Sequence, residues 1–121
     1  MVLGYDAAGD GPPLVLIHGF PFDRRMWAGQ LDPRGGLTGI RRVVAPDLRG
    51  RGLSPSANGD PAAWTIEDHA DDVAALIRSL GPDPADVGGL SMGGYIAFAL
   101  LRRHPEMVRS LLLMSTRAAA D

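Results

Sequence analysis

Two reactive residue types are missing from this sequence, which contains no cysteine and no lysine. The absence of cysteine excludes a disulfide, a thiolate nucleophile and a cysteine-ligated metal. The absence of lysine excludes a Schiff base and a P-loop, and all 12 basic residues are arginines. The net charge of −2 gives no electrostatic reason to expect nucleic acid or an anionic membrane as a partner.

Long apolar segments are missing as well. No apolar run approaches the roughly 20 residues needed to cross a bilayer. The first residues lack the basic start and the apolar stretch of a signal peptide, so we expect a cytoplasmic protein. The 121 residues, of which 45% are hydrophobic and 21% charged, fit one globular domain over residues 1–121.

Short apolar runs recur along the chain at residues 14–17, 43–45, 87–90 and 111–114. Runs that are apolar without alternation suit strands that are buried on both faces, as in a parallel sheet. Helical patterns lie between these runs. Strands that alternate with helices predict an α/β fold with a mostly parallel sheet and right-handed crossovers.

The clearest helical pattern begins after Thr65, which can cap it, and ends at Gly81. A second helix is expected over residues 93–103. It is apolar almost all round and should therefore be buried. A short helix is also expected over residues 24–31.

The motif most informative about chemistry is G-L-S-M-G at residues 89–93, a G-x-S-x-G sequence between a predicted strand and a predicted helix. Such a turn needs small residues at Gly89 and Gly93, because a Cβ would crowd the neighbouring backbone. The turn would lift the Ser91 hydroxyl above the end of the strand, near a helix amino terminus that favours negative charge. The alternative is a glycine-rich turn in which Ser91 only caps the helix.

A second motif, H-G-F-P at residues 18–21, follows the first predicted strand. A loop here can direct a backbone N–H toward the same point as the N–H of Met92, and two convergent donors form an oxyanion hole. The two donors would be the amides of Phe20 and Met92. His18, at the root of the loop, is interpreted as a hydrogen-bonded structural residue in preference to a catalytic base.

A third segment, residues 46–54, follows the strand predicted at 42–45. Asp47 and Arg49 are predicted to pair and to hold this loop in place. Gly50 and Gly52 match part of a dinucleotide-binding fingerprint, but Pro55 occupies the third glycine position and no helix begins there. The segment is therefore interpreted as structural.

Together the three motifs resemble the α/β-hydrolase superfamily from about Tyr5 to the end of the chain. They are similar to its small esterase, enol-lactonase and cofactor-free haloperoxidase-like branch. The resemblance implies that Ser91 is the nucleophile and that the amides of Phe20 and Met92 form the oxyanion hole. It implies an incomplete core that ends after the strand at 111–114, without cap or C-terminal strands, and no metal or organic cofactor. Trp27 and Phe20 are candidates to line an acyl pocket, with a core position as the alternative for Trp27.

The resemblance breaks at the catalytic triad, whose acid and histidine follow the nucleophile in this family. The one histidine after Ser91 is His104, which closes the helix about 20 Å away at a rise of about 1.5 Å per residue. The acids after Ser91 are Glu106 and Asp121. His69 is interpreted as a solvated residue on a helix that flanks the sheet. A serine without a base is a poor nucleophile, so the isolated chain is expected to be weakly active or inactive.

The predicted function is acyl transfer on a small carboxylic ester or lactone, with the triad acid and histidine absent from this chain. Serine at position 91 argues against chemistries that use a carboxylate nucleophile. The alternatives are an inactive fragment or interaction module that keeps the scaffold, and an incomplete product of a longer gene. An unpaired apolar edge at residues 111–114 would favour self-association or pairing with a complementing chain.

Overall fold

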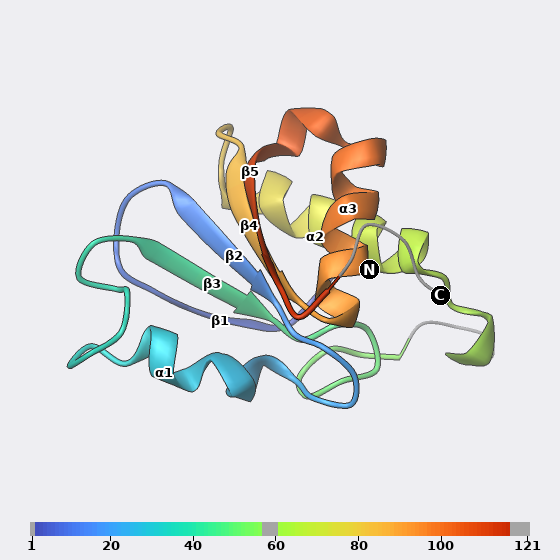
Figure 1. Ribbon diagram of the computed structural model, residues 1–121, viewed down its shortest axis with the longest axis horizontal. Coiled ribbons are helices and arrows are strands. Elements are labelled where there is room, and N and C mark those ends of the chain that lie inside the picture. The colour runs from blue at the N-terminus through green and yellow to red at the C-terminus, as the bar shows by residue number, and fades with distance from the viewer. Residues whose placement is uncertain (1, 57–60, 117–121) are drawn as a thin grey trace.

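A twisted five-stranded sheet forms the centre of the computed structural model, which describes residues 2–56 and 61–116 (Figure 1). Its strands are β1 (Tyr5–Ala8), β2 (Pro13–Ile17), β3 (Arg42–Pro46), β4 (Ala85–Leu90) and β5 (Val108–Met114). Their order in the sheet is β1-β3-β2-β4-β5. β1 runs antiparallel to β3, and the other neighbouring strands are parallel. The predicted α/β fold with a mostly parallel sheet is confirmed.

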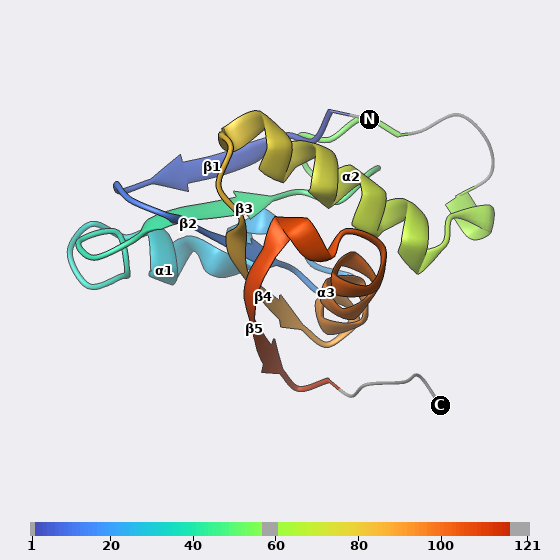
Figure 2. The same cartoon turned by 90° about the horizontal axis from the view of Figure 1, so that it is seen from above.

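Helices cover both faces of this sheet. The 3-10 helix η1 (Arg24–Trp27) continues into α1 (Ala28–Leu31) on one face, while α2 (Ile66–Leu80) and α3 (Met92–Arg103) pack together on the other (Figure 2). Two more 3-10 helices are η2 (Pro61–Ala63) and η3 (Pro105–Met107). Along β2, Val15 and Ile17 join the core under α2 and α3, whereas Leu14 and Leu16 join a second cluster with Trp27. Trp27 therefore takes the core position that was the alternative to an acyl pocket.

The ends of α2 lie where the sequence predicts them. The Thr65 hydroxyl accepts a hydrogen bond from the Asp68 amide at 3.1 Å, and the Asp68 carboxylate accepts one from the Thr65 amide at 2.9 Å. This reciprocal capping box satisfies two amides that the helix itself cannot. At the other end, Gly81 has a φ of 142°, a backbone conformation that favours glycine.

The structure differs from the sequence predictions at three places, in α3, β1 and β5. α3 buries Ile96 and Leu100, but Leu101 is 39% exposed, so the helix is not buried all round. β1 was not predicted, because its four residues are mostly exposed and form no apolar run. β5 begins at Val108, before the predicted apolar run, because its polar residues Arg109 and Ser110 both bond to Asp86 of β4.

Candidate active site

Ser91 is the single residue between β4 and α3, and its backbone turns sharply there. Its angles are φ 53° and ψ −113°, in a region that residues with a side chain rarely occupy. The Ser91 amide donates to the Met114 carbonyl at 2.9 Å, and the Ser91 carbonyl accepts from the Gly94 amide at 2.9 Å. Ser91 is exposed at the carboxyl end of the parallel strands. The predicted strand-to-turn-to-helix geometry is present.

The glycines of the motif are required by contacts within the turn. A Cβ on Gly89 would collide with the Gly93 carbonyl, and a Cβ on Gly93 would collide with the carbonyl of Ile17 in β2. The colliding atoms are backbone, which cannot move aside as the end of a flexible side chain can. The turn therefore packs directly on the root of the loop that follows β2.

That loop brings Phe20 beside the turn. A Cβ built on Gly19 would lie 3.0 Å from the Leu90 carbonyl oxygen and 3.6 Å from the Ser91 Cβ. Within the described residues, neither the Phe20 amide nor the Met92 amide donates a hydrogen bond. The Phe20 ring is 66% exposed.

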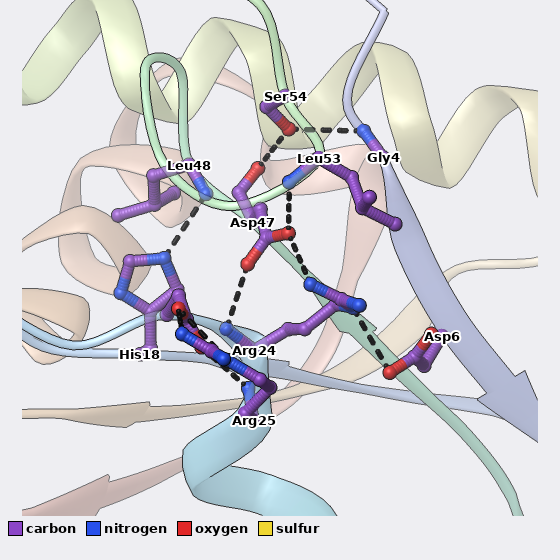
Figure 3. Close-up of polar contacts among 10 residues, drawn as sticks. Gly4, Asp6, His18, Arg24, Arg25, Asp47, Leu48, Leu53 and Ser54 are labelled. Carbon is purple, nitrogen blue, oxygen red and sulfur yellow. Dashed lines mark hydrogen bonds and ion pairs between the residues drawn. The ribbon is translucent and has the colours of Figure 1, made fainter.

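His18 fixes the root of the same loop. Its ring is buried, and Nε2 accepts a hydrogen bond from the Leu48 amide at 3.0 Å (Figure 3). Nδ1 lies 3.1 Å from the Gly19 carbonyl oxygen. Burial lowers the pKa of His18, which favours the neutral ring that this acceptor geometry needs. These contacts agree with the interpretation of His18 as a structural residue.

The predicted pairing of Asp47 with Arg49 is wrong. The buried Asp47 carboxylate accepts from Arg24 Nη1 at 2.8 Å, from the Arg24 amide at 2.7 Å and from the Leu53 amide at 2.7 Å (Figure 3). Arg49 instead makes two hydrogen bonds, of 2.7 and 2.9 Å, to the buried Asp72 of α2. The loop is held by its neighbours in space, and only the assembled fold determines which charges meet.

A pocket of about 210 Å³ is lined by Met92, the residue that follows Ser91 in the chain, although Ser91 itself does not line it. Phe20 and Met92 both line it, together with His18, Leu48, Arg49, Arg51, Pro61, Trp64 and His69. A larger hollow of about 590 Å³ lies against β1, η1 and α1, away from this turn. The smaller pocket is the one that adjoins the residues singled out from the sequence.

His69 lines this pocket, so its interpretation as a solvated residue is wrong. The ring is half-buried and meets Trp64 edge-on, with 6.4 Å between the ring centroids. Burial first, and then the charge of Arg49, lower the pKa of His69. The spacing of α2 carries a signal that could have placed it, since His69, Asp72 and Leu76 recur at three- and four-residue intervals.

The remaining histidine lies at the far end of α3. His104 Nε2 is 2.7 Å from the Asp71 carboxylate, and Nδ1 is 3.2 Å from Arg78. None of the three histidines hydrogen bonds to the Ser91 hydroxyl in the described parts of the chain.

The described ranges also offer no obvious metal site and no membrane span. In residues 2–56 and 61–116, no three histidine or acidic side chains gather where they could bind a metal ion. No helix in those ranges combines the length and apolar character needed to cross a bilayer.

Comparison with known proteins gives a consistent family. The model of the alpha/beta hydrolase fold family matches residues 12–120. A 2-hydroxymuconate semialdehyde hydrolase of Pseudomonas sp. (strain CF600) is 39% identical over 112 residues, covering 90% of this chain and 38% of the relative. The first curated relatives are matched over 44% of their length, so the chain spans about two fifths of the relatives it matches.

Solved structures give the same result. A thermophilic esterase from Thermogutta terrifontis superposes with a TM-score of 0.88 at 43% identity, covering 98% of this chain and 42% of that one. The N-acyl homoserine lactonase AidH superposes with a TM-score of 0.86 at 33% identity, with the same coverage of 98% and 42%.

Proposed function

Because this chain belongs to the alpha/beta hydrolase fold family, we propose that it supplies the nucleophile and the oxyanion hole for acyl transfer on small carboxylic esters or lactones. The esterase and the lactonase among the solved neighbours support this choice of substrate class. The observation that carries the proposal is an exposed serine on a strained turn, beside two backbone amides that have no acceptor in the described structure.

In the proposed reaction the Ser91 oxygen attacks the substrate carbonyl carbon, and the carbonyl oxygen becomes an oxyanion. The amides of Phe20 and Met92 donate to that oxyanion, and each such donor is worth on the order of 3 kcal/mol of transition-state stabilisation. The alcohol then leaves with a proton, so an ester of Ser91 remains. Water hydrolyses this acyl-enzyme and regenerates the hydroxyl.

The proton of Ser91 needs an acceptor that the three histidines of this chain do not provide. His18 is committed to Leu48, His104 to Asp71, and His69 lines the pocket without bonding to Ser91. We therefore propose that the general base comes from outside these imidazoles. The same observation favours a second candidate, a scaffold that keeps the hydrolase fold without catalysis.

Chemical rescue separates the two candidates. The full chain is incubated with p-nitrophenyl acetate over a range of imidazole concentrations, beside Ser91→Ala and Ser115→Ala. Ser115 is a matched control, since it is also exposed and has a positive φ of 49°. We expect imidazole to accelerate release of p-nitrophenol by the unchanged chain and by Ser115→Ala above the Ser91→Ala background. Equal rates for all three proteins would favour the inactive scaffold.

The exposed strand β5 supports a proposal about assembly. β5 is the last strand of the sheet order, and Leu112 and Leu113 on it are 49% and 41% exposed. An apolar edge strand is a template for pairing with another strand. We propose that this edge pairs with a second copy or with a complementing chain.

A further inference from the structure

Among the residues that the structure describes, Arg51 differs from most arginines in having no acidic partner. Nine of the arginines in the described residues have a carboxylate oxygen within 4.0 Å: 24, 25, 34, 41, 49, 78, 102, 103 and 109. In the same ranges Arg42 and Arg51 have none. Arg42 begins β3, at the opposite end of the strands from Ser91, whereas Arg51 lines the pocket beside Ser91.

The guanidinium of Arg51 is nevertheless held in place. Its Cζ lies 4.8 Å from the centroid of the Phe20 ring, and Nη1 is 3.5 Å from the Pro21 carbonyl oxygen. Stacking on an aromatic ring orients the planar cation, and the long contact to Pro21 leaves most of its N–H groups available. An oriented guanidinium with free donors suits a planar carboxylate.

Within the described ranges, Arg51 is the one charged group lining the pocket that has no opposite charge beside it. Arg49 also lines the pocket, but Asp72 neutralises it through two hydrogen bonds of 2.7 and 2.9 Å. Burial lowers the pKa of His18 and of His69, so both rings favour the neutral form. Phe20, Leu48, Trp64 and Met92 supply mostly apolar walls.

We propose that this pocket binds an acyl chain that ends in a carboxylate, and that Arg51 recognises the carboxylate. The substrate class is then the half-esters of short dicarboxylic acids. A volume of about 210 Å³ has room for roughly seven groups the size of a water molecule, which matches a chain of four or five carbons. The assignment of an acyl chain rests on the proposed function of Ser91, whereas anion binding by Arg51 does not.

Binding is measured first, with ligands that do not acylate serine. Succinamate carries one carboxylate, and succinamide is its neutral counterpart. Each is titrated into the full chain while amide chemical shifts around the pocket are followed by NMR. Charge-assisted hydrogen bonds are roughly twice as strong as neutral ones, so we expect succinamate to bind on the order of 10-fold more tightly than succinamide. Equal affinities for the two ligands would overturn the proposal.

Variants of Arg51 assign the effect to this side chain. Arg51→Gln should remove the preference for succinamate, and Arg51→Lys should keep part of it because the charge remains. The matched control is Arg102→Gln, which removes an exposed arginine of α3 whose nearest acid is 3.7 Å away. It should bind succinamate as the unchanged chain does. An unchanged preference in Arg51→Gln, or an equal loss in Arg102→Gln, would contradict the proposal.

The two proposals can fail separately. Ser91→Ala should bind succinamate normally, because the Ser91 hydroxyl is not needed to hold the anion. In the imidazole assay, Arg51→Gln should lower the rate on p-nitrophenyl hemisuccinate relative to p-nitrophenyl butyrate. If turnover requires Ser91 but that ratio does not change, only the role of Arg51 is overturned. If binding of succinamate depends on Arg51 but ester turnover is independent of Ser91, only the hydrolase proposal fails.

Discussion

The backbone of Ser91 lies in a conformation that costs a residue with a Cβ about 1 to 3 kcal/mol. Contacts on both sides maintain it, since Gly89 and Gly93 pack backbone to backbone and Gly93 packs on Ile17. In this conformation Ser91 is exposed at the end of β4.

Relief of this strain is measurable as stability. Ser91→Gly should raise the free energy of unfolding by about 1 kcal/mol, because strain relief exceeds the roughly 0.5 to 1 kcal/mol of extra chain entropy that glycine brings to the unfolded state. Ser91→Ala keeps the Cβ and should change stability by less than about 0.5 kcal/mol. Urea denaturation compares the two variants. A Ser91→Gly protein that is less stable than Ser91→Ala would show that the turn is not strained.

Individual side chains also show what can be predicted without a structure. The G-x-S-x-G turn was predictable because its glycines are required by close backbone contacts, which lie within a few residues of the turn or in the adjacent strand. The partners of Asp47 and Arg49 were not predictable, because they come from η1 and α2, whose positions depend on the assembled sheet. The place of His69 was predictable in part, because its three- and four-residue spacing from Asp72 and Leu76 puts it on the same side of α2 as these buried residues.

Between elements, the polar link that ties β4 to β5 is centred on Asp86. Its carboxylate is buried and accepts from Arg109 at 2.7 Å, from Ser110 at 2.6 Å and from Arg41 at 2.7 Å. The Arg109 guanidinium above all, helped by Ser110 and Arg41, lowers the pKa of Asp86 well below its usual range against the opposing effect of burial. These bonds explain why β5 extends into polar sequence.

Stability should therefore depend on pH through Asp86. A carboxylate whose pKa is lower in the folded state stabilises the fold above its unfolded pKa of about 3.9, and that contribution is lost as the pH falls below it. Asp86→Asn should cost about 2 to 3 kcal/mol at neutral pH, because two arginines lose a charged acceptor. The difference in free energy of unfolding between the variant and the unchanged chain should begin to narrow below about pH 5 and should go on narrowing below pH 3, toward the folded pKa.

Urea midpoints measured across that range test the link between the strands. Asp10→Asn is the control, since Asp10 is exposed and belongs to no ion pair in the described residues. The urea midpoint of Asp10→Asn should equal that of the unchanged chain at every pH. If the difference in urea midpoint between Asp86→Asn and the unchanged chain stays constant down to pH 3, the ionised carboxylate does not stabilise the fold.

The boundaries of α2 were predicted closely, because its capping box and terminal glycine act locally. β1 was not predicted, since an exposed edge strand needs no apolar run and is defined by its pairing with β3. Local signals thus determine helix ends in this chain, whereas strand limits depend on neighbours in the sheet.

Taken as a folded unit, the chain exposes β5 at one end of its sheet (Figure 1). Self-association through this edge should increase with concentration in light scattering coupled to size exclusion. Leu112→Lys should reduce the apparent mass at high concentration, because a charge disfavours edge-to-edge pairing. Ile40→Lys is the control, since Ile40 is 78% exposed but lies outside the strands. A chain that stays monomeric at all concentrations, with or without these changes, would contradict pairing between copies.

The mostly parallel pairing was predictable from the alternation of strand and helix signals along the chain, whereas the strand order β1-β3-β2-β4-β5 was not predicted. The pocket did not follow, because it is assembled from the loop after β2, the loop after β3, the start of α2 and the start of α3. No single stretch of sequence contains enough of it to be recognised.

A nucleophilic Ser91 becomes acylated during the reaction, and mass spectrometry of the trapped intermediate detects the acyl group. The chain is treated with p-nitrophenyl acetate and imidazole, quenched in acid, and digested with a protease that cleaves after arginine, which releases Ser91 within residues 79–102. The sequence contains no lysine that could take up acetyl groups in competition. We predict one acetyl group on Ser91, absent from Ser91→Ala and present in Ser115→Ala. An acetyl group on Ser79 or elsewhere, or an unmodified Ser91 in the folded chain, would contradict the assignment of Ser91 as the nucleophile.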